Sequence, residues 1–161
     1  TSSPTVITAS NFPPANVEVL GAGIYCLEGN FRVTASNAVL SGDDVTFVML
    51  NGGVTINGGD IQLSAPESGP LPNLLFYQPQ ENTSSSDSFS FSGNAGADSA
   101  LYLDGMILAP GNQININGGS NTVIDSQIVG CKFSISGSAG TVINYNDDNN
   151  VNDPPQIELI Q

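Results

Sequence analysis

The sequence predicts an all-β fold, a right-handed parallel β-helix (β-solenoid) of about five coils with three short strands each. One observation is a phrase that occurs five times: apolar, polar, apolar, a small hydroxyl or amide residue, then Ala or Gly. A second is that each copy lies between two further short apolar stretches. Alternation with period two indicates a strand with one buried face, and recurrence at roughly twenty residues plus insertions indicates stacked coils. The copies are FRVTA (31–35), VTING (54–58), FSFSG (89–93), INING (114–118) and FSISG (133–137).

The coils are expected to begin at Ile24, Val45, Leu74, Met106 and Gln127. The second is the clearest, with strands over residues 45–50, 54–57 and 61–65 and glycine turns between them. Spacing is irregular in the middle of the chain, where residues 66–72 and 80–88 are rich in Pro, Ser and Gly. Insertions in a repeat array are tolerated as surface loops that leave the stacked core intact, so we expect loops there.

Stacking places equivalent residues above one another, which predicts inward-facing columns. Three columns are expected: Phe31, Val54, Phe89, Ile114, Phe133; then Val33, Ile56, Phe91, Ile116, Ile135; and Leu40, Leu63, Leu103, Val123, Val142. The fourth residue of each phrase is expected at a corner, where amides and hydroxyls hydrogen-bond to their counterparts one coil away. Packing alone explains all of these positions.

The solenoid is expected over residues 21–146, with an N-terminal extension over 1–20 and an acidic linker with a C-terminal strand over 147–161. Both flanks contain a short alternating segment, around Val6 and Ile7 and around Ile157 and Leu159, and each is set off by a pair of prolines. An uncapped solenoid ends in unpaired backbone groups. The flanking strands can therefore cap their own rod or pair with an adjacent subunit by strand addition, and both interpretations remain open.

The chain is strongly acidic, with 15 acidic and 2 basic residues and a formal net charge of −13. This charge excludes binding of nucleic-acid phosphates as a main activity, because that requires clustered Lys and Arg. No apolar run is long enough to cross a bilayer, and the absence of a leader favours a processed or excised chain. Acidic surfaces suit secreted proteins and attract divalent cations, so we expect a secreted or cell-surface location.

The densest acidic stretch contains Asp147, Asp148 and Asp153 among asparagines. Carboxylates and amides are the ligands that calcium prefers, so a calcium site is one interpretation; a solvated linker is the other. Neither interpretation requires a cofactor for the fold or the function. Asn82 begins an Asn-Thr-Ser sequon and is a candidate for glycosylation.

The sequence offers little for catalysis, and we expect no enzyme. There is no His and no Gly-x-Ser-x-Gly motif. A polysaccharide lyase would need cations to hold a uronate, yet Arg32 and Lys132 are expected in different outermost coils, four strand spacings apart. A hydrolase pair could be drawn from Asp60, Asp104 and Asp125, although nothing in the sequence brings two of them together.

The two cysteines are expected near opposite ends of the rod, with Cys26 in the first coil and Cys131 in the last. A disulfide needs Cα atoms within about 7 Å, so the pair should not close within one subunit. Either both are buried thiols, or head-to-tail stacking brings Cys131 against Cys26 of the next copy, where an oxidising exterior would join them.

Several ordered segments, at residues 23–29, 45–66, 74–78, 105–110 and 127–130, resemble the solenoid region of secreted TadE/TadG-like (Tad/Flp-type) pilus-assembly proteins. The resemblance covers approximately residues 20–146. It implies an extracellular or cell-surface structural element and carries over no catalytic residue.

Taken together, these features predict a structural protein whose copies associate head to tail into a filament or surface layer. Solenoid edges, the flanking strands and the cysteines would form the contacts. The competing hypothesis is an adhesin or glycan-binding rod that presents Tyr25, Phe76, Tyr77 and the long loops.

Overall fold

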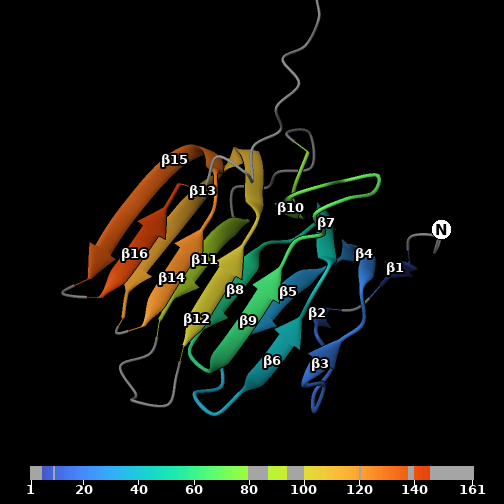
Figure 1. Ribbon diagram of the computed structural model, residues 1–161, viewed down its shortest axis with the longest axis horizontal. Coiled ribbons are helices and arrows are strands. Elements are labelled where there is room, and N and C mark those ends of the chain that lie inside the picture. The colour runs from blue at the N-terminus through green and yellow to red at the C-terminus, as the bar shows by residue number, and fades with distance from the viewer. Residues whose placement is uncertain are drawn as a thin grey trace, which may run out of the picture.

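The computed structural model describes residues 5–8, 10–79, 87–93, 100–119, 121–137 and 140–145. Every regular element in this part of the chain is a β strand, and all pairings are parallel. The strands stack in coils around one apolar interior, so the predicted β-solenoid is confirmed (Figure 1).

The rod has three faces, each a ladder of parallel strands. The first holds β1 (Thr5–Ile7), β4 (Gly23–Glu28), β7 (Val45–Asn51) and β10 (Leu74–Tyr77). The second holds β2 (Asn11–Phe12), β5 (Asn30–Val33), β8 (Val54–Asn57) and β11 (Ser88–Ser92). The third holds β3 (Val19–Leu20), β6 (Val39–Gly42), β9 (Asp60–Ser64), β12 (Leu101–Asp104), β14 (Thr122–Asp125) and β16 (Thr141–Asn144).

The two longest strands, β13 (Met106–Gly118) and β15 (Ile128–Gly137), each cover both the first and the second face. The sequence predicted two separate strands in these coils. Instead, backbone pairing continues around the corner, with a register shift between Ala109 and Gln113. Three strands per coil therefore holds for the first four coils, and each of the last two coils has one long strand and one strand of four residues.

The structure has six coils, one more than expected. Strands β1, β2 and β3 pair with β4, β5 and β6, so residues expected in an N-terminal extension continue the ladders as a further coil. The sequence did not reveal this coil because two-residue strands such as β2 and β3 are too short to display alternation. The five coils that were expected begin within one residue of the predicted positions.

The first two inward columns are confirmed by the strand register, but of the third only the pair Leu63 and Leu103 is confirmed. The observed columns on the third face are Leu40, Ile61, Leu101, Thr122, Thr141 and Gly42, Leu63, Leu103, Ile124, Ile143. Val123 and Val142 lie instead in register with Tyr102, on the outer side of this face. The expected register was one residue off at β14 and β16, which moves Val123 and Val142 to the opposite face, and two residues off at β6, which leaves Leu40 facing inward.

Aromatic rings fill the interior of the N-terminal half. Tyr25, Phe47 and Phe76 stack on successive coils, with ring centroids 5.5 and 5.0 Å apart. Phe31 meets Phe47 edge to face at 4.8 Å. The next residue in this stack is Ile107, so the interior becomes aliphatic toward the C-terminal half. Such pairs add about 0.5–1.5 kcal/mol each beyond area burial, which makes the first half the more tightly packed one.

Stacked polar side chains form hydrogen bonds at the corners between the faces, as predicted. Asn117 Nδ2 donates to Ser92 Oγ at 3.2 Å, and Ser136 Oγ donates to Asn117 Oδ1. At the buried corner between the first two faces, Gln78 Nε2 donates to the carbonyl oxygen of Gly52 at 3.0 Å, and Asn112 Nδ2 donates to Gln78 Oε1. These ladders bind consecutive coils to each other, so their polar groups are structural.

Candidate functional site

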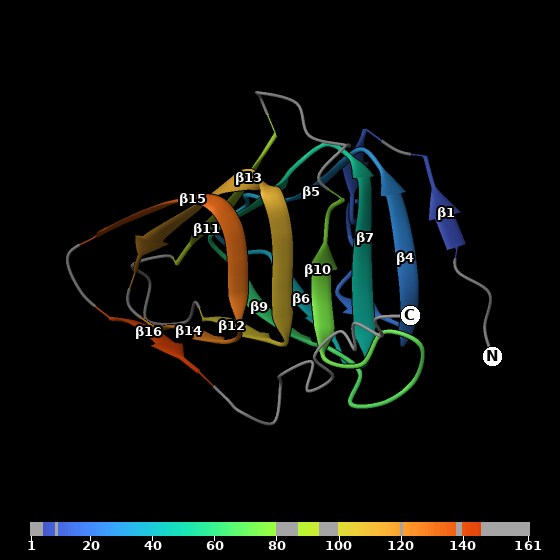
Figure 2. The same ribbon diagram turned by 90° about the horizontal axis from the view of Figure 1, so that it is seen from above.

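The C-terminal end of the rod exposes the interior of the solenoid. Figure 2 shows β15 and β16 at one end and β1 at the other. Phe133, Ile135 and Ile143 continue three inward columns, yet they are 47%, 65% and 43% exposed. Their neighbours one coil further in, at positions 114, 116 and 124, are at most 1% exposed. No strand pairs with the outer edges of β15 and β16 within the described part of the chain.

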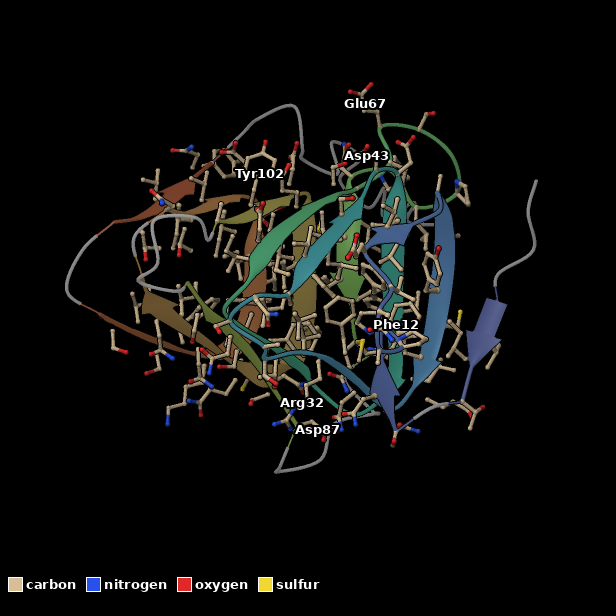
Figure 3. The ribbon with its side chains drawn as sticks, turned by 90° about the horizontal axis from the view of Figure 1, so that it is seen from below. Phe12, Arg32, Asp43, Glu67, Asp87 and Tyr102 are labelled. Carbon is tan, nitrogen blue, oxygen red and sulfur yellow. The ribbon has the colours of Figure 1, made fainter. Side chains whose placement is uncertain are left out.

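The N-terminal end has a different character, because its first coil closes over the interior. Phe12 is only 5% exposed and Leu20 only 7%. The Phe12 ring lies against Tyr25, Phe31 and Phe47, at centroid distances of 5.5, 6.1 and 6.2 Å. Figure 3 shows the labelled Phe12 side chain directed into the core. The strands at this end have only two or three residues, and β2 is followed by Pro13, so this end offers little edge for pairing.

The two N-terminal residues predicted to take part in assembly point in opposite directions. Val6 is 58% exposed on the outer side of the first face, and Ile7 packs against the core. Both belong to β1, which is paired along its length with β4. This segment is therefore an integral strand of the solenoid in the structure, and only its outer edge is open for pairing.

The C-terminal coil also differs in charge from the rest of the protein. Residues 126–145 contain no Asp or Glu and one cation, Lys132, although the chain carries 15 acidic residues. Two copies with a net charge of −13 repel each other, and an acid-free end is where that repulsion is smallest. Depletion of charge together with exposed apolar side chains is typical of the core of a protein interface.

Both cysteines are free thiols, and the structure corrects the predicted position of one. Cys26 is half-buried in the second coil, where β1 separates it from the N-terminal end. Cys131 is exposed on β15, in the last coil. Because four strand spacings of about 4.8 Å separate their strands, no disulfide forms within a subunit. Coil-on-coil stacking does not bring Cys131 against Cys26 of the next copy either, since a whole coil lies between them.

The two basic side chains are too far apart to act together on one anionic group. Arg32 lies on β5 and Lys132 on β15, and β8, β11 and β13 separate these strands as predicted. Arg32 borders a cleft of about 440 Å³ formed with the segment 13–18 and residues of β5 and β6. A lyase that holds a uronate carboxylate between these two cations is therefore not supported by the geometry.

One pair of the predicted carboxylates does come together. Asp104 and Asp125 occupy paired positions on β12 and β14, whereas Asp60 lies at the other end of its strand. Tyr102 OH donates to Asp125 Oδ2 at 3.5 Å. Partial burial, followed by the charges of the two carboxylates, raises the pKa of the Tyr102 phenol above its usual 10.0.

Two carboxylates one strand spacing apart fall near the separation used by retaining glycosidases, about 5–5.5 Å. A hydrolase must also enclose the sugar, and among the described residues this pair does not line the cleft at positions 22–71 or the cleft at positions 13–40. Figure 3 shows Tyr102 and Arg32 on different sides of the rod, so no cation joins this group from that position. The arrangement is a polar column on a sheet face, and the absence of catalysis stays a prediction.

The three aromatic residues named for the competing glycan-binding hypothesis do not form an exposed surface. Phe76 is fully buried, and Tyr25 packs between Phe12 and Phe47. Tyr77 is half-buried on the outer side of β10. The sequence analysis placed Tyr25 and Phe76 on the surface, but both lie in register with Phe47, whose side chain points inward. Register partners on neighbouring strands face the same side of a sheet, so both rings are directed into the core.

Several predicted site residues lie outside the described residues. They are Asp147, Asp148 and Asp153 for calcium, Ile157 and Leu159 for assembly, and Asn82 for glycosylation. Within the part that is described, no group of three or more acidic or cysteine side chains is arranged to hold a metal ion. Nor does that part contain a helix with the length and apolar character to cross a membrane.

Comparison with protein-family models, with curated proteins and with solved structures found no match for this chain. The resemblance to TadE/TadG-like proteins therefore stays an expectation drawn from the sequence. The residues that sequence reasoning missed as a site are Phe133, Ile135 and Ile143. The sequence did contain a signal for this site. The three residues are the last apolar members of their columns, and the acidic stretch Asp-Asp-Asn follows at residues 147–149.

Proposed function

We propose that this protein is an extracellular structural β-solenoid whose copies associate through their ends, with the C-terminal coil as the main contact surface. The observation that carries the proposal is the exposure of Phe133, Ile135 and Ile143 at that end. Covering such side chains contributes about 25 cal/mol per Å² of apolar surface removed from water. The outer edge of β15 adds a row of unpaired backbone donors and acceptors that a second β strand can satisfy.

The structural role and the location outside the cell rest on the acidic composition and on the resemblance to secreted pilus-assembly proteins. A filament or surface layer, the larger structure that the sequence suggested, would require a further contact in addition to the one between C-terminal coils. Calcium bound by Asp147, Asp148 and Asp153 would reduce the repulsion between acidic rods and so favour association.

The test is sedimentation velocity together with negative-stain electron microscopy of the purified chain over a range of concentrations. We expect association that increases with concentration and with salt, since salt screens the net negative charge. Ile135→Asp should abolish it by placing a carboxylate in the apolar contact. Val19→Asp is the matched control, because Val19 is 72% exposed on the outer side of the opposite end.

A chelator arm on the same samples tests the calcium expectation separately. Monodisperse monomers of the unmodified chain at every concentration would overturn the proposed function.

A further inference from the structure

The two ends of the rod offer very different lengths of strand edge. At the C-terminal end, β15 presents ten residues and β16 four. At the N-terminal end, β1, β2 and β3 present three, two and two residues. Head-to-tail stacking would lay the ten-residue edge of β15 against five residues of β1 and β2, which leaves much of that edge without a hydrogen-bond partner. Since an unsatisfied buried backbone group costs about 1–3 kcal/mol, this mismatch disfavours a head-to-tail contact.

The N-terminal end is also a poor apolar partner. Phe12 and Leu20 are already covered within the first coil, so that end has little apolar surface left to bury. The C-terminal end has the reverse character, with Phe133, Ile135 and Ile143 all uncovered. The surface that best matches this end in apolar character and edge length is a second copy of the same end.

The sequence after this coil does not repeat its apolar pattern. Ile107 pairs with Ile128 at an interval of 21 residues, and Thr122 with Thr141 at 19. A seventh coil at these intervals would place residues 147–149 at the inward position, and these are Asp-Asp-Asn. A carboxylate at that position would be buried in an apolar interior at a large free-energy cost, so the sequence does not predict another layer of the same kind.

We propose that two copies join tail to tail through their C-terminal coils, about a two-fold axis perpendicular to the rod. This inference rests on the proposed function and specifies its partner. The two-fold operation places the same surface patch on both sides of the contact, and it brings the edges of the two β15 strands together in antiparallel orientation. The apolar side chains of one end coil then pack against those of the other, and the acid-free coils minimise repulsion between the two acidic rods.

The proposed arrangement makes a specific statement about the cysteines. Cys131 lies near the middle of β15, so an axis that relates β15 to its copy passes close to it. The two Cys131 thiols of a dimer are therefore neighbours. Cys26, on β4 in the second coil, lies four strand spacings away from β15 and far from the joint.

The experiment treats full-length single-cysteine variants with a short bismaleimide, which links two nearby thiols. Cys26→Ala retains Cys131 and should give covalent dimers with nothing larger, while Cys131→Ala retains Cys26 and should give none. Sedimentation of the uncrosslinked chain should level off at twice the monomer mass. Adding Ile135→Asp to the Cys26→Ala variant should lower the cross-linked fraction at least about tenfold, which corresponds to a loss of about 1.4 kcal/mol or more.

The other outcomes separate this inference from the proposed function. Assemblies larger than dimers in sedimentation, with no cross-linking through Cys131 alone, would refute the tail-to-tail contact and keep end-to-end association. A monomeric chain at every concentration would refute both. A chain that is monomeric when complete but dimeric when cut after Tyr145 would show that residues 146–161 cover this end, which overturns the second copy as its occupant.

Discussion

Ile116 and Ile135 form a matched pair that tests whether the C-terminal end is open. The two residues have the same side chain and pair directly on β13 and β15, one coil apart. Ile116 is 1% exposed and Ile135 is 65% exposed. Replacing each by Ala therefore measures burial at two successive layers of one column, with side-chain chemistry held constant.

The expected magnitudes follow from these exposures. Ile→Ala removes three carbons, which contribute about 0.8 kcal/mol each when fully buried, or about 2.4 kcal/mol together. At Ile116 an enclosed cavity adds to this, so a loss of about 3–4 kcal/mol in unfolding free energy is expected. Only about a third of Ile135 is covered, and truncation there opens no enclosed cavity. The expected loss in the separate subunit is about 0.8 kcal/mol.

The assay is urea unfolding followed by circular dichroism, at one protein concentration below association and one above it. At the lower concentration the two variants should differ by about 2–3 kcal/mol. At the higher concentration the loss caused by Ile135→Ala should increase, because it then also weakens the association that stabilises the folded chain. Equal losses for both variants in the dilute sample would refute the reasoning, since the end would then be covered within a single subunit.

Three further predictions concern single positions. Thr122→Val should raise the unfolding free energy by about 1–2 kcal/mol in chemical denaturation, because Thr122 is fully buried and its hydroxyl has no hydrogen-bond partner in the described part. Gly59→Ala should lower it by more than Gly69→Ala: both have positive φ, but a Cβ at Gly59 would lie 2.7 Å from a backbone oxygen of the preceding coil, while Gly69 has open space. Stability should fall as pH rises above about 10, because a raised pKa of Tyr102 in the folded state means that the unfolded chain loses this proton first. Asp125→Asn should bring the Tyr102 pKa, measured by ultraviolet titration, back toward 10.0.

Most of the repeating part of the fold could be predicted from the sequence. Strand β8 has the bounds expected of it, and β7, β10 and β13 begin at the expected residues. Strand β8 alternates between buried and more exposed residues, so its period-two signal is strong, whereas β7, β10 and β13 begin with consecutive buried residues and read as short apolar runs. Phe31, Val54 and Phe89 stack in register because the same phrase recurs with the same length.

The parts that could not be predicted are those where local alternation carries no information. Strands β2 and β3 have two residues each, and they were recognised only once their partners in β5 and β6 were known. The register of the third face depends on turn lengths, and Gly42 takes a place in a column where the repeat suggested a leucine. Continuity of backbone pairing around the corner of β13 likewise depends on contacts with β15.

One physical rule, that apolar side chains must be covered, explains both ends of the rod, although one end is closed and the other is open. In a stacked solenoid each coil is covered by the next, so every apolar column must end in a residue that something else covers. At the N-terminal end the strands shorten and the ring of Phe12 lies across Tyr25, Phe31 and Phe47. At the C-terminal end β15 keeps its full length, and Phe133 and Ile135 repeat the inward pattern of buried coils. The last coil has the composition of an interior layer although it lies at the end of the rod. It therefore presents an apolar surface that another surface should cover, and a second copy of the same coil has the matching apolar character.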